Sequence, residues 1–142
     1  GVMDAETRDL YESSLLALAK DRVREGRLTQ FDATSTRKNP FCGDEVAVDL
    51  SIQDGLVSGS GYEAKACSLC VASAELLVQW IDEGPTPDEV LLREQAVKAL
   101  LKGEEPPKGL EALASVAPFR ARHKCVTLPW EAAAAAVKEL KK

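Results

Sequence analysis

The sequence predicts an α+β fold in which one helix is followed by two or three antiparallel strands and then by further helices. Apolar residues alternate with small or polar ones over positions 46–52, which is the pattern of a half-buried strand. The Asp54-Gly55 pair that follows is typical of a two-residue hairpin turn. After Cys67 the apolar period changes from two to about 3.6, which indicates a change from strand to helix.

The elements before the hairpin are weakly patterned. Asp4 can cap a first helix that we expect to run to about residue 25, with Gly26 as its stop. Its apolar stripe is narrow, so we expect this helix to pack at the periphery. Residues 27–40 are polar and aperiodic, and they predict a loop with a short edge strand. The second strand of the hairpin should run from residue 56 to about residue 66.

Helices are expected over most of the remaining chain. The helix that starts at Cys67 should end at Gly84 and Pro85, which break the pattern. A capping box with Pro at the first helical position then opens the next helix at Thr86. The expected later elements are a helix over 87–102, a polar loop over 103–109, a short helix over 110–116, an extended stretch over 117–119 and a final helix that begins near Cys125.

Length and composition bound the possible functions. A chain of 142 residues fits one domain over 1–142. We expect Gly1 and Val2, ahead of Met3, to be a cloning remnant. The net charge of −5 argues against a nucleic-acid partner, because such affinity comes largely from Lys and Arg. No uncharged apolar run approaches the ~20 residues needed to cross a membrane. Four cysteines and an acidic start favour a cytoplasmic protein without a disulfide framework.

Three cysteines carry the main functional signal. Cys42, Cys67 and Cys125 each lie where a loop or strand leads into the next element, which is where a fold can gather distant side chains into one site. Cys67 and Cys125 both lie where a helix is expected to begin, and a helix N-terminus favours the thiolate that binds metal. The alternative is that all three are buried structural thiols, since free cysteine often behaves as a small apolar residue.

Asp44 adds an oxygen ligand to the three sulfurs. Gly43 permits a tight turn after Cys42, so the Asp44 carboxylate can point toward the same place as the sulfur. Three thiolates and one carboxylate form a four-coordinate set that suits Zn²⁺, and the two irons of a [2Fe–2S] cluster can also accept it. The alternative for Asp44 is a turn carboxylate with no ligand role.

Four further residues near these cysteines have open roles. Cys70 falls on the helix stripe expected to pack against the sheet, and its alternative is a redox pair with Cys67. His123 would share a face with Cys125 in an extended segment, so it could replace Asp44 as the fourth ligand. Arg122 and Lys124 would lie on the other face of that segment. Their charges would then either act on the thiolates or be solvated.

Three motifs together resemble a known family. They are NPFCGD at residues 39–44, ACSLCVASA at residues 66–74 and ARHKCVTL at residues 121–128. They look like the three cysteine motifs of the NifU/IscU/SufU iron–sulfur cluster assembly proteins, and the sequence approaching the third cysteine is most similar to the SufU branch. The resemblance implies a small antiparallel sheet covered by helices and a ligand set of Cys42, Asp44, Cys67 and Cys125.

The resemblance leaves three functions open. The first is a scaffold that assembles an iron–sulfur cluster and passes it to apoproteins. The second is a zinc protein that accepts persulfide sulfur from a cysteine desulfurase, with Cys125 as the acceptor; this function is closer to that of an enzyme. The third is a diverged relative whose zinc is only structural. One ligand set serves all three.

Overall fold

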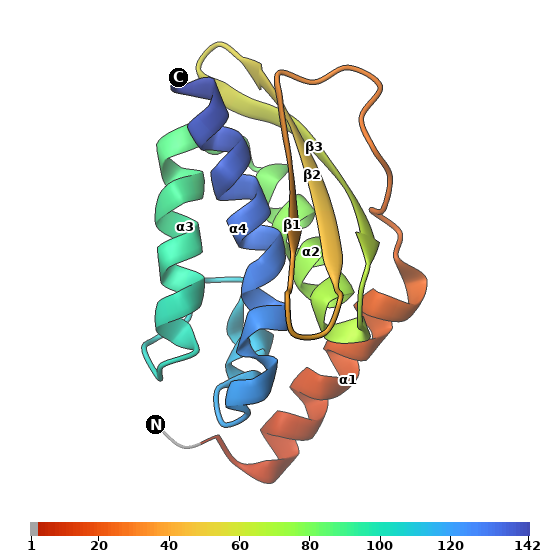
Figure 1. Cartoon of the computed structure of the whole chain (residues 1–142). Coiled ribbons are helices and arrows are strands. Elements are labelled where there is room, and N and C mark those ends of the chain that lie inside the picture. The colour runs from red at the N-terminus through yellow and green to blue at the C-terminus, as the bar shows by residue number, and fades with distance from the viewer. Residues whose placement is uncertain (1–2) are drawn as a thin grey trace.

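The computed structural model describes residues 3–142 and has the α+β architecture that the sequence predicts (Figure 1). Gly1 and Val2, expected to be a cloning remnant, lie outside the described residues. The elements in chain order are α1 (Ala5–Asp21), β1 (Ala33–Lys38), β2 (Glu45–Gln53), β3 (Leu56–Lys65), α2 (Ser68–Ile81), α3 (Pro87–Leu100), the 3-10 helices η1 (Glu111–Val116) and η2 (Arg120–Arg122), and α4 (His123–Leu140).

The three strands form one antiparallel sheet in the order β1-β2-β3. The hairpin between β2 and β3 turns at Asp54 and Gly55, whose φ angles of 54° and 79° match the twist of the paired strands. Both the hairpin and the short edge strand β1 are therefore confirmed.

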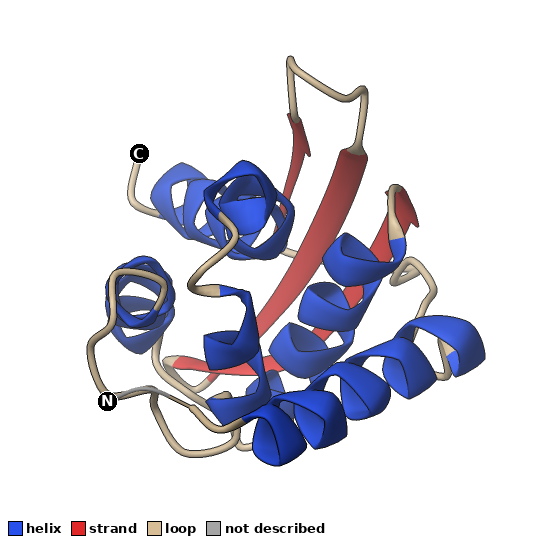
Figure 2. Cartoon of the chain, turned by 90° about the horizontal axis from the view of Figure 1, so that it is seen from below, coloured by secondary structure: helices blue, strands red, loops and turns tan. Residues whose placement is uncertain are grey.

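The helices gather on one side of the sheet (Figure 2). Helix α4 covers β1 and β2, and α2 lies beside it against β3. Helices α3 and α1 then pack against α4 and α2, respectively. The core lies between the layers, where Val46, Val48 and Leu50 are fully buried. No helix within residues 3–142 is long and apolar enough to span a membrane.

Two expectations about where elements begin and end are wrong. Helix α1 ends at Asp21, not near residue 25, because Arg22 takes a left-handed conformation and its Nη2 donates to the Ala64 carbonyl at 2.9 Å. The expected extended stretch over residues 117–119 is a turn instead, in which the Phe119 N–H donates to the Val116 carbonyl at 2.8 Å, and Arg120–Arg122 then forms a 3-10 turn that leads directly into α4. Helix α4 therefore starts at His123, two residues before Cys125.

The segment between α1 and β1 crosses the sheet at Gly61. Gly26 pairs with Tyr62, and the fully buried Asp49 accepts hydrogen bonds from the Arg27 side chain and from the Leu28 N–H. Burial alone would raise the pKa of Asp49, but these hydrogen bonds outweigh it and leave the pKa lowered. A Cβ on Gly61 would lie 2.5 Å from the Gly26 carbonyl oxygen, so glycine is required for this close approach.

Gly61→Ala is therefore expected to destabilise the protein by about 2 kcal/mol, which lowers Tm by about 6 °C. The control is Gly59→Ala in the same strand, because a Cβ there meets no atom within 4 Å. Calorimetric melting of the two variants checks the expectation. Equal Tm values would contradict the close crossing at Gly61.

Candidate metal centre

Three segments that are distant in sequence meet at one end of the molecule. The β1–β2 turn, the start of α2 and the start of α4 lie toward the same end (Figure 1). They carry Asp44, Cys67 and Cys125, whose ligand atoms all lie within 4.8 Å of one another. The structure thus brings together three of the four ligands expected from the sequence.

The β1–β2 turn is shaped by Asn39, which is buried. Its Oδ1 accepts a hydrogen bond from the Phe41 N–H at 3.0 Å, and its backbone N–H donates to the Asp44 carbonyl at 2.8 Å. Gly43 has a φ of 76°, a conformation that favours glycine. These bonds close the turn and fix Asp44 at the start of β2.

The carboxylate of Asp44 is buried and incompletely bonded. Its Oδ2 has no hydrogen-bond partner among residues 3–142. Leaving a buried charged oxygen without a partner is costly. A cation bound between this oxygen and the two neighbouring sulfurs would supply the missing partner.

Cys42 lies outside the compact group, which consists of Asp44, Cys67 and Cys125. It is exposed in the turn, and the preceding Phe41 is 92% exposed. Cys125 is half-buried, whereas Cys67 is exposed. Cys42 is therefore the sulfur of the predicted set that lies apart from the other three ligands.

Both cysteines of the compact group lie at helix starts, as expected. Cys67 is the N-cap residue of α2 with extended backbone angles (φ −65°, ψ 163°), and its side chain makes no capping hydrogen bond. Cys125 lies in the first turn of α4. The uncapped N–H groups at the start of α2 favour an anionic ligand atom at Cys67.

Burial and the neighbouring acidic groups oppose ionisation of the Cys125 thiol. Burial raises the pKa of the Cys125 thiol to about 12, and the neighbouring Cys67, Asp44 and Cys42 add to this shift. A divalent cation would remove the conflict, because thiolates bind it as anions. The donor set therefore fits zinc in both chemistry and charge.

Cys70 adjoins the site but is not among its close ligand atoms. It is fully buried in the core, where burial raises the pKa of its thiol. It is also absent from the group of ligand atoms formed by the described residues. This agrees with the packing role expected for it and gives no support to a redox pair with Cys67.

His123 does not occupy the position that made it an alternative ligand. It is the first residue of α4 instead of part of an extended segment, and its Nε2 lies 2.9 Å from the Ala117 carbonyl. Residues two apart on a helix do not share a face, so the reason for pairing it with Cys125 no longer holds. Lys124 forms a 2.7 Å ion pair with Glu131.

A buried polar contact that joins the two ligand-bearing helices was missed from the sequence. The Ser73 hydroxyl of α2 donates to the Val126 carbonyl of α4 at 2.6 Å and accepts from the Trp130 Nε1 at 2.9 Å. All three residues are fully buried. The only sequence signal is a serine within the otherwise apolar run of α2. This contact fixes α2 and α4 relative to each other, and with them Cys67 and Cys125.

Comparisons with known proteins agree with this geometry. Residues 10–142 match the family described as NifU-like N terminal domain. The chain is 26% identical over 135 residues to the iron-sulfur cluster assembly scaffold protein IscU of Thermotoga maritima, covering 92% of this chain and 94% of that protein. It is 31% identical over 134 residues to the zinc-dependent sulfurtransferase SufU of Bacillus subtilis, covering 91% and 90%.

A solved structure shares the fold. The N-terminal part of a NifU-like protein from Brucella abortus superposes with a TM-score of 0.85 at 29% identity, covering 94% of this chain and 95% of that chain. The expected small antiparallel sheet covered by helices is thus confirmed both by the structure and by a neighbour of similar length.

Proposed function

Because the chain belongs to the NifU-like N terminal domain family, we propose that it acts in iron–sulfur cluster assembly through a metal centre held by Asp44, Cys67 and Cys125. Cys42 is the fourth ligand in this proposal. Four free thiols fit a reducing compartment, so we place this activity in the cytoplasm.

The spacing of the three donor atoms favours a single zinc ion over an iron–sulfur cluster. A Zn–S bond is about 2.3 Å long, so sulfur ligands around one tetrahedral ion lie about 3.8 Å apart. The donors of Asp44, Cys67 and Cys125 fall within 4.8 Å of one another, which suits a single ion. A [2Fe–2S] cluster would instead divide its four ligands between two irons.

The function that this geometry supports best is that of a zinc-dependent sulfur acceptor for a cysteine desulfurase. Bound zinc would keep its sulfur ligands as thiolates at neutral pH. The 31% identical relative named as a zinc-dependent sulfurtransferase supports the same function. Cys42 is our candidate acceptor because it is exposed and lies outside the compact group, and Cys125 is the second candidate.

The transfer is a thiol exchange. The acceptor thiolate attacks the outer sulfur of the desulfurase persulfide, a new S–S bond forms on the acceptor, and the S–S bond of the donor breaks. The donor cysteine leaves as a thiolate, so one sulfur atom and its proton move and no external oxidant is needed. Exposure of Cys42 allows the partner's sulfur to reach it.

A scaffold for a nascent [2Fe–2S] cluster, which would then pass to apoproteins, is the second candidate function. One observation favours it: Asp44 supplies a hard oxygen ligand within the sulfur set, and stable clusters prefer sulfur. Such a ligand would make a cluster easier to release. The IscU relative of Thermotoga maritima is named as a scaffold of this kind.

Metal analysis tests the centre itself. We expect the purified protein to contain about one Zn²⁺ per chain, and we expect a chelator to lower Tm by about 10 °C, because a ligand that binds only the folded state stabilises it. Elemental analysis and calorimetry with and without chelator measure both. If the purified protein contains no metal and added zinc leaves its Tm unchanged, the proposed metal centre is wrong.

Two further measurements separate the candidate functions. Persulfide on the zinc-loaded protein after mixing with desulfurase and cysteine supports the sulfur acceptor. A stable [2Fe–2S] spectrum after anaerobic reconstitution, without persulfide, supports the scaffold instead.

A further inference from the structure

Helix α4 contains a proline one turn after Cys125. Pro129 lies inside the helix and is buried. An α-helix joins the carbonyl of each residue to the N–H four positions later, and proline has no N–H. The Cys125 carbonyl therefore lacks its usual partner in the helix, and the proline ring crowds the same carbonyl. The turn that carries Cys125 is thus joined to the rest of α4 by one backbone hydrogen bond fewer than an unbroken helix would have.

The other two residues of the compact group are attached by regular backbone hydrogen bonds. The Cys67 carbonyl accepts from the Val71 N–H at 3.1 Å, which is the helical bond between residues four apart. The Asp44 carbonyl accepts from the Asn39 N–H at 2.8 Å. The weakened backbone attachment is therefore specific to Cys125.

Contacts with α2 fix α4 from Val126 onward. The Ser73 hydroxyl donates to the Val126 carbonyl and accepts from the Trp130 Nε1, so it holds α4 on both sides of the proline. Residues 126–130 are all buried, whereas residues 123–125 are half-buried. The boundary between the firmly packed part of α4 and its first turn lies directly after Cys125.

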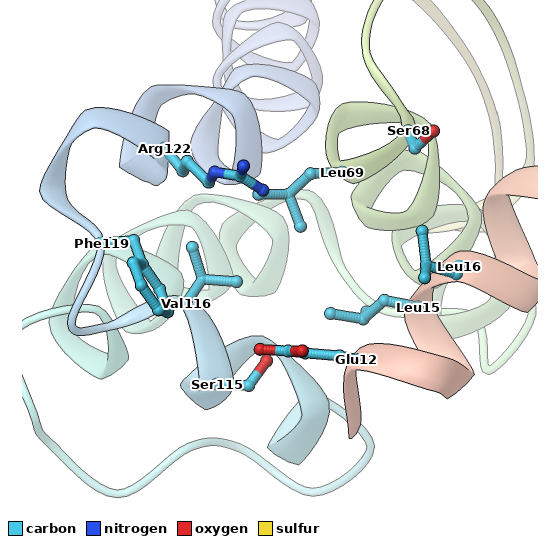
Figure 3. Close-up of a pocket in the computed structure, with 9 residues that line it drawn as sticks. All are labelled: Glu12, Leu15, Leu16, Ser68, Leu69, Ser115, Val116, Phe119 and Arg122. Atoms are coloured by element: carbon cyan, nitrogen blue, oxygen red, sulfur yellow. The ribbon is translucent and has the colours of Figure 1, made fainter. Parts of the chain in front are cut away.

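The start of α4 has open space beside it. Arg122, the residue before the helix, lines a groove of about 370 Å³ and points across it toward Leu69 at the start of α2 (Figure 3). His123 and Lys124 border a second groove, of about 400 Å³, on the side of α3. A turn bordered by grooves can shift without displacing side chains of the core.

Two side-chain contacts hold this turn in place. The Lys124 Nζ pairs with Glu131 at 2.7 Å, and the His123 Nε2 lies 2.9 Å from the Ala117 carbonyl. The Lys124 side chain is 41% exposed, so solvent weakens its ion pair. Contacts of this strength keep the turn closed most of the time and still allow it to open.

We propose that Pro129 is a positioning residue of the metal centre: it leaves the first turn of α4 free to open, so that the centre takes up and releases zinc on the Cys125 side. Opening of the turn withdraws the Cys125 sulfur while Asp44 and Cys67 stay in place. Because the Ser73 contact is kept, α2 and α4 remain packed together. This inference rests on the metal centre of the proposed function.

Pro129→Ala and Pro129→Val test this role, because both restore the missing N–H while one side chain is smaller than proline and the other is larger. We expect both variants to release zinc to a chelator about fivefold more slowly than the wild type, the effect of one backbone hydrogen bond. The matched control is Pro87→Ala, since Pro87 is the first residue of α3, where a helix needs no N–H. A chelating dye measures the release rate, after melting confirms that each variant is folded.

Hydrogen exchange of the zinc-free protein gives a second reading that needs no metal. The amides of residues 127 and 128 close the first turn of α4. We expect them to exchange about fivefold more slowly in Pro129→Ala than in the wild type, for the same reason, whereas the amides of residues 134–137 should be unchanged.

The outcomes separate the two levels of inference. If the wild-type protein binds no zinc, the proposed metal centre fails and the role of Pro129 with it. If the wild type binds zinc but both Pro129 variants release it at the wild-type rate, the role of Pro129 fails alone. Opposite changes in Pro129→Ala and Pro129→Val would assign the effect to side-chain volume instead of the missing N–H, and would also overturn the proposal.

Discussion

Cys67→Ser is expected to abolish stoichiometric zinc binding, whereas Cys70→Ser should leave it intact. The two cysteines are three positions apart on the same helix start, so the pair isolates ligand geometry from local sequence. Cys67 supplies one of three ligand atoms within 4.8 Å of one another, and serine is a poor replacement for a thiolate on zinc. Elemental analysis of the two purified variants checks the expectation.

The melting temperatures of the two variants should not follow their zinc contents. Cys70 is fully buried, so Cys70→Ser places a hydroxyl in the core at a cost of about 1–3 kcal/mol even though zinc remains bound. Cys67 is exposed, and its replacement should lower Tm mainly through the lost metal. Added chelator should therefore shift the Tm of Cys70→Ser but not that of Cys67→Ser. Equal loss of zinc from both variants would bring Cys70 into the ligand set and contradict the structure.

Local patterns predicted the elements that local interactions determine. The Asp54-Gly55 turn sets the β2–β3 hairpin through its own backbone angles, and the capping box at Thr86 and Glu89 starts α3 with hydrogen bonds between neighbouring residues. Both were correct because no distant partner is needed. The apolar alternation placed Val46, Val48 and Leu50 in the core because the backbone of a strand by itself puts every second residue on one face.

Distant contacts decided the features that sequence patterns placed wrongly. The end of α1 depends on Arg22, whose side chain bonds the Ala64 carbonyl 42 positions away. Asp49 lies on the face of the strand expected to meet solvent, yet Arg27 and Leu28 cover it. The alternative ligand role of His123 required an extended segment, but η2 and the start of α4 occupy that part of the chain. No periodicity in the sequence records these partners.

In the candidate site, too, sequence motifs predicted the residues involved but not the features that depend on distant contacts. The motifs identified Asp44, Cys67 and Cys125, which the fold gathers within 4.8 Å. They did not reveal that Cys42 stays exposed in its turn, because exposure depends on how the turn packs against the other segments. The ligand role of all four residues stays a proposal until metal analysis of the variants.

Cys42→Ser is expected to abolish persulfide formation while zinc stays bound. Asp44, Cys67 and Cys125 remain to hold the ion, but the exposed sulfur outside that compact group is gone. Cys125→Ser should abolish both, because it removes a donor from the compact group. The ratio of zinc content to persulfide therefore distinguishes the loss of an acceptor from the loss of the centre.

The position of the added sulfur can be read directly, because trypsin separates the cysteines. Cleavage after Lys and Arg gives one peptide over residues 39–65 with Cys42, one over 66–93 with Cys67 and Cys70, and one over 125–138 with Cys125. After reaction with desulfurase and cysteine, and alkylation to preserve the persulfide, we expect the extra sulfur mass on the first peptide. Extra mass on the third peptide would make the half-buried Cys125 the acceptor, and the centre would then have to open during transfer. Exposure of Cys42 favours the first result, since this thiolate can leave the metal and attack while Asp44, Cys67 and Cys125 still hold the ion.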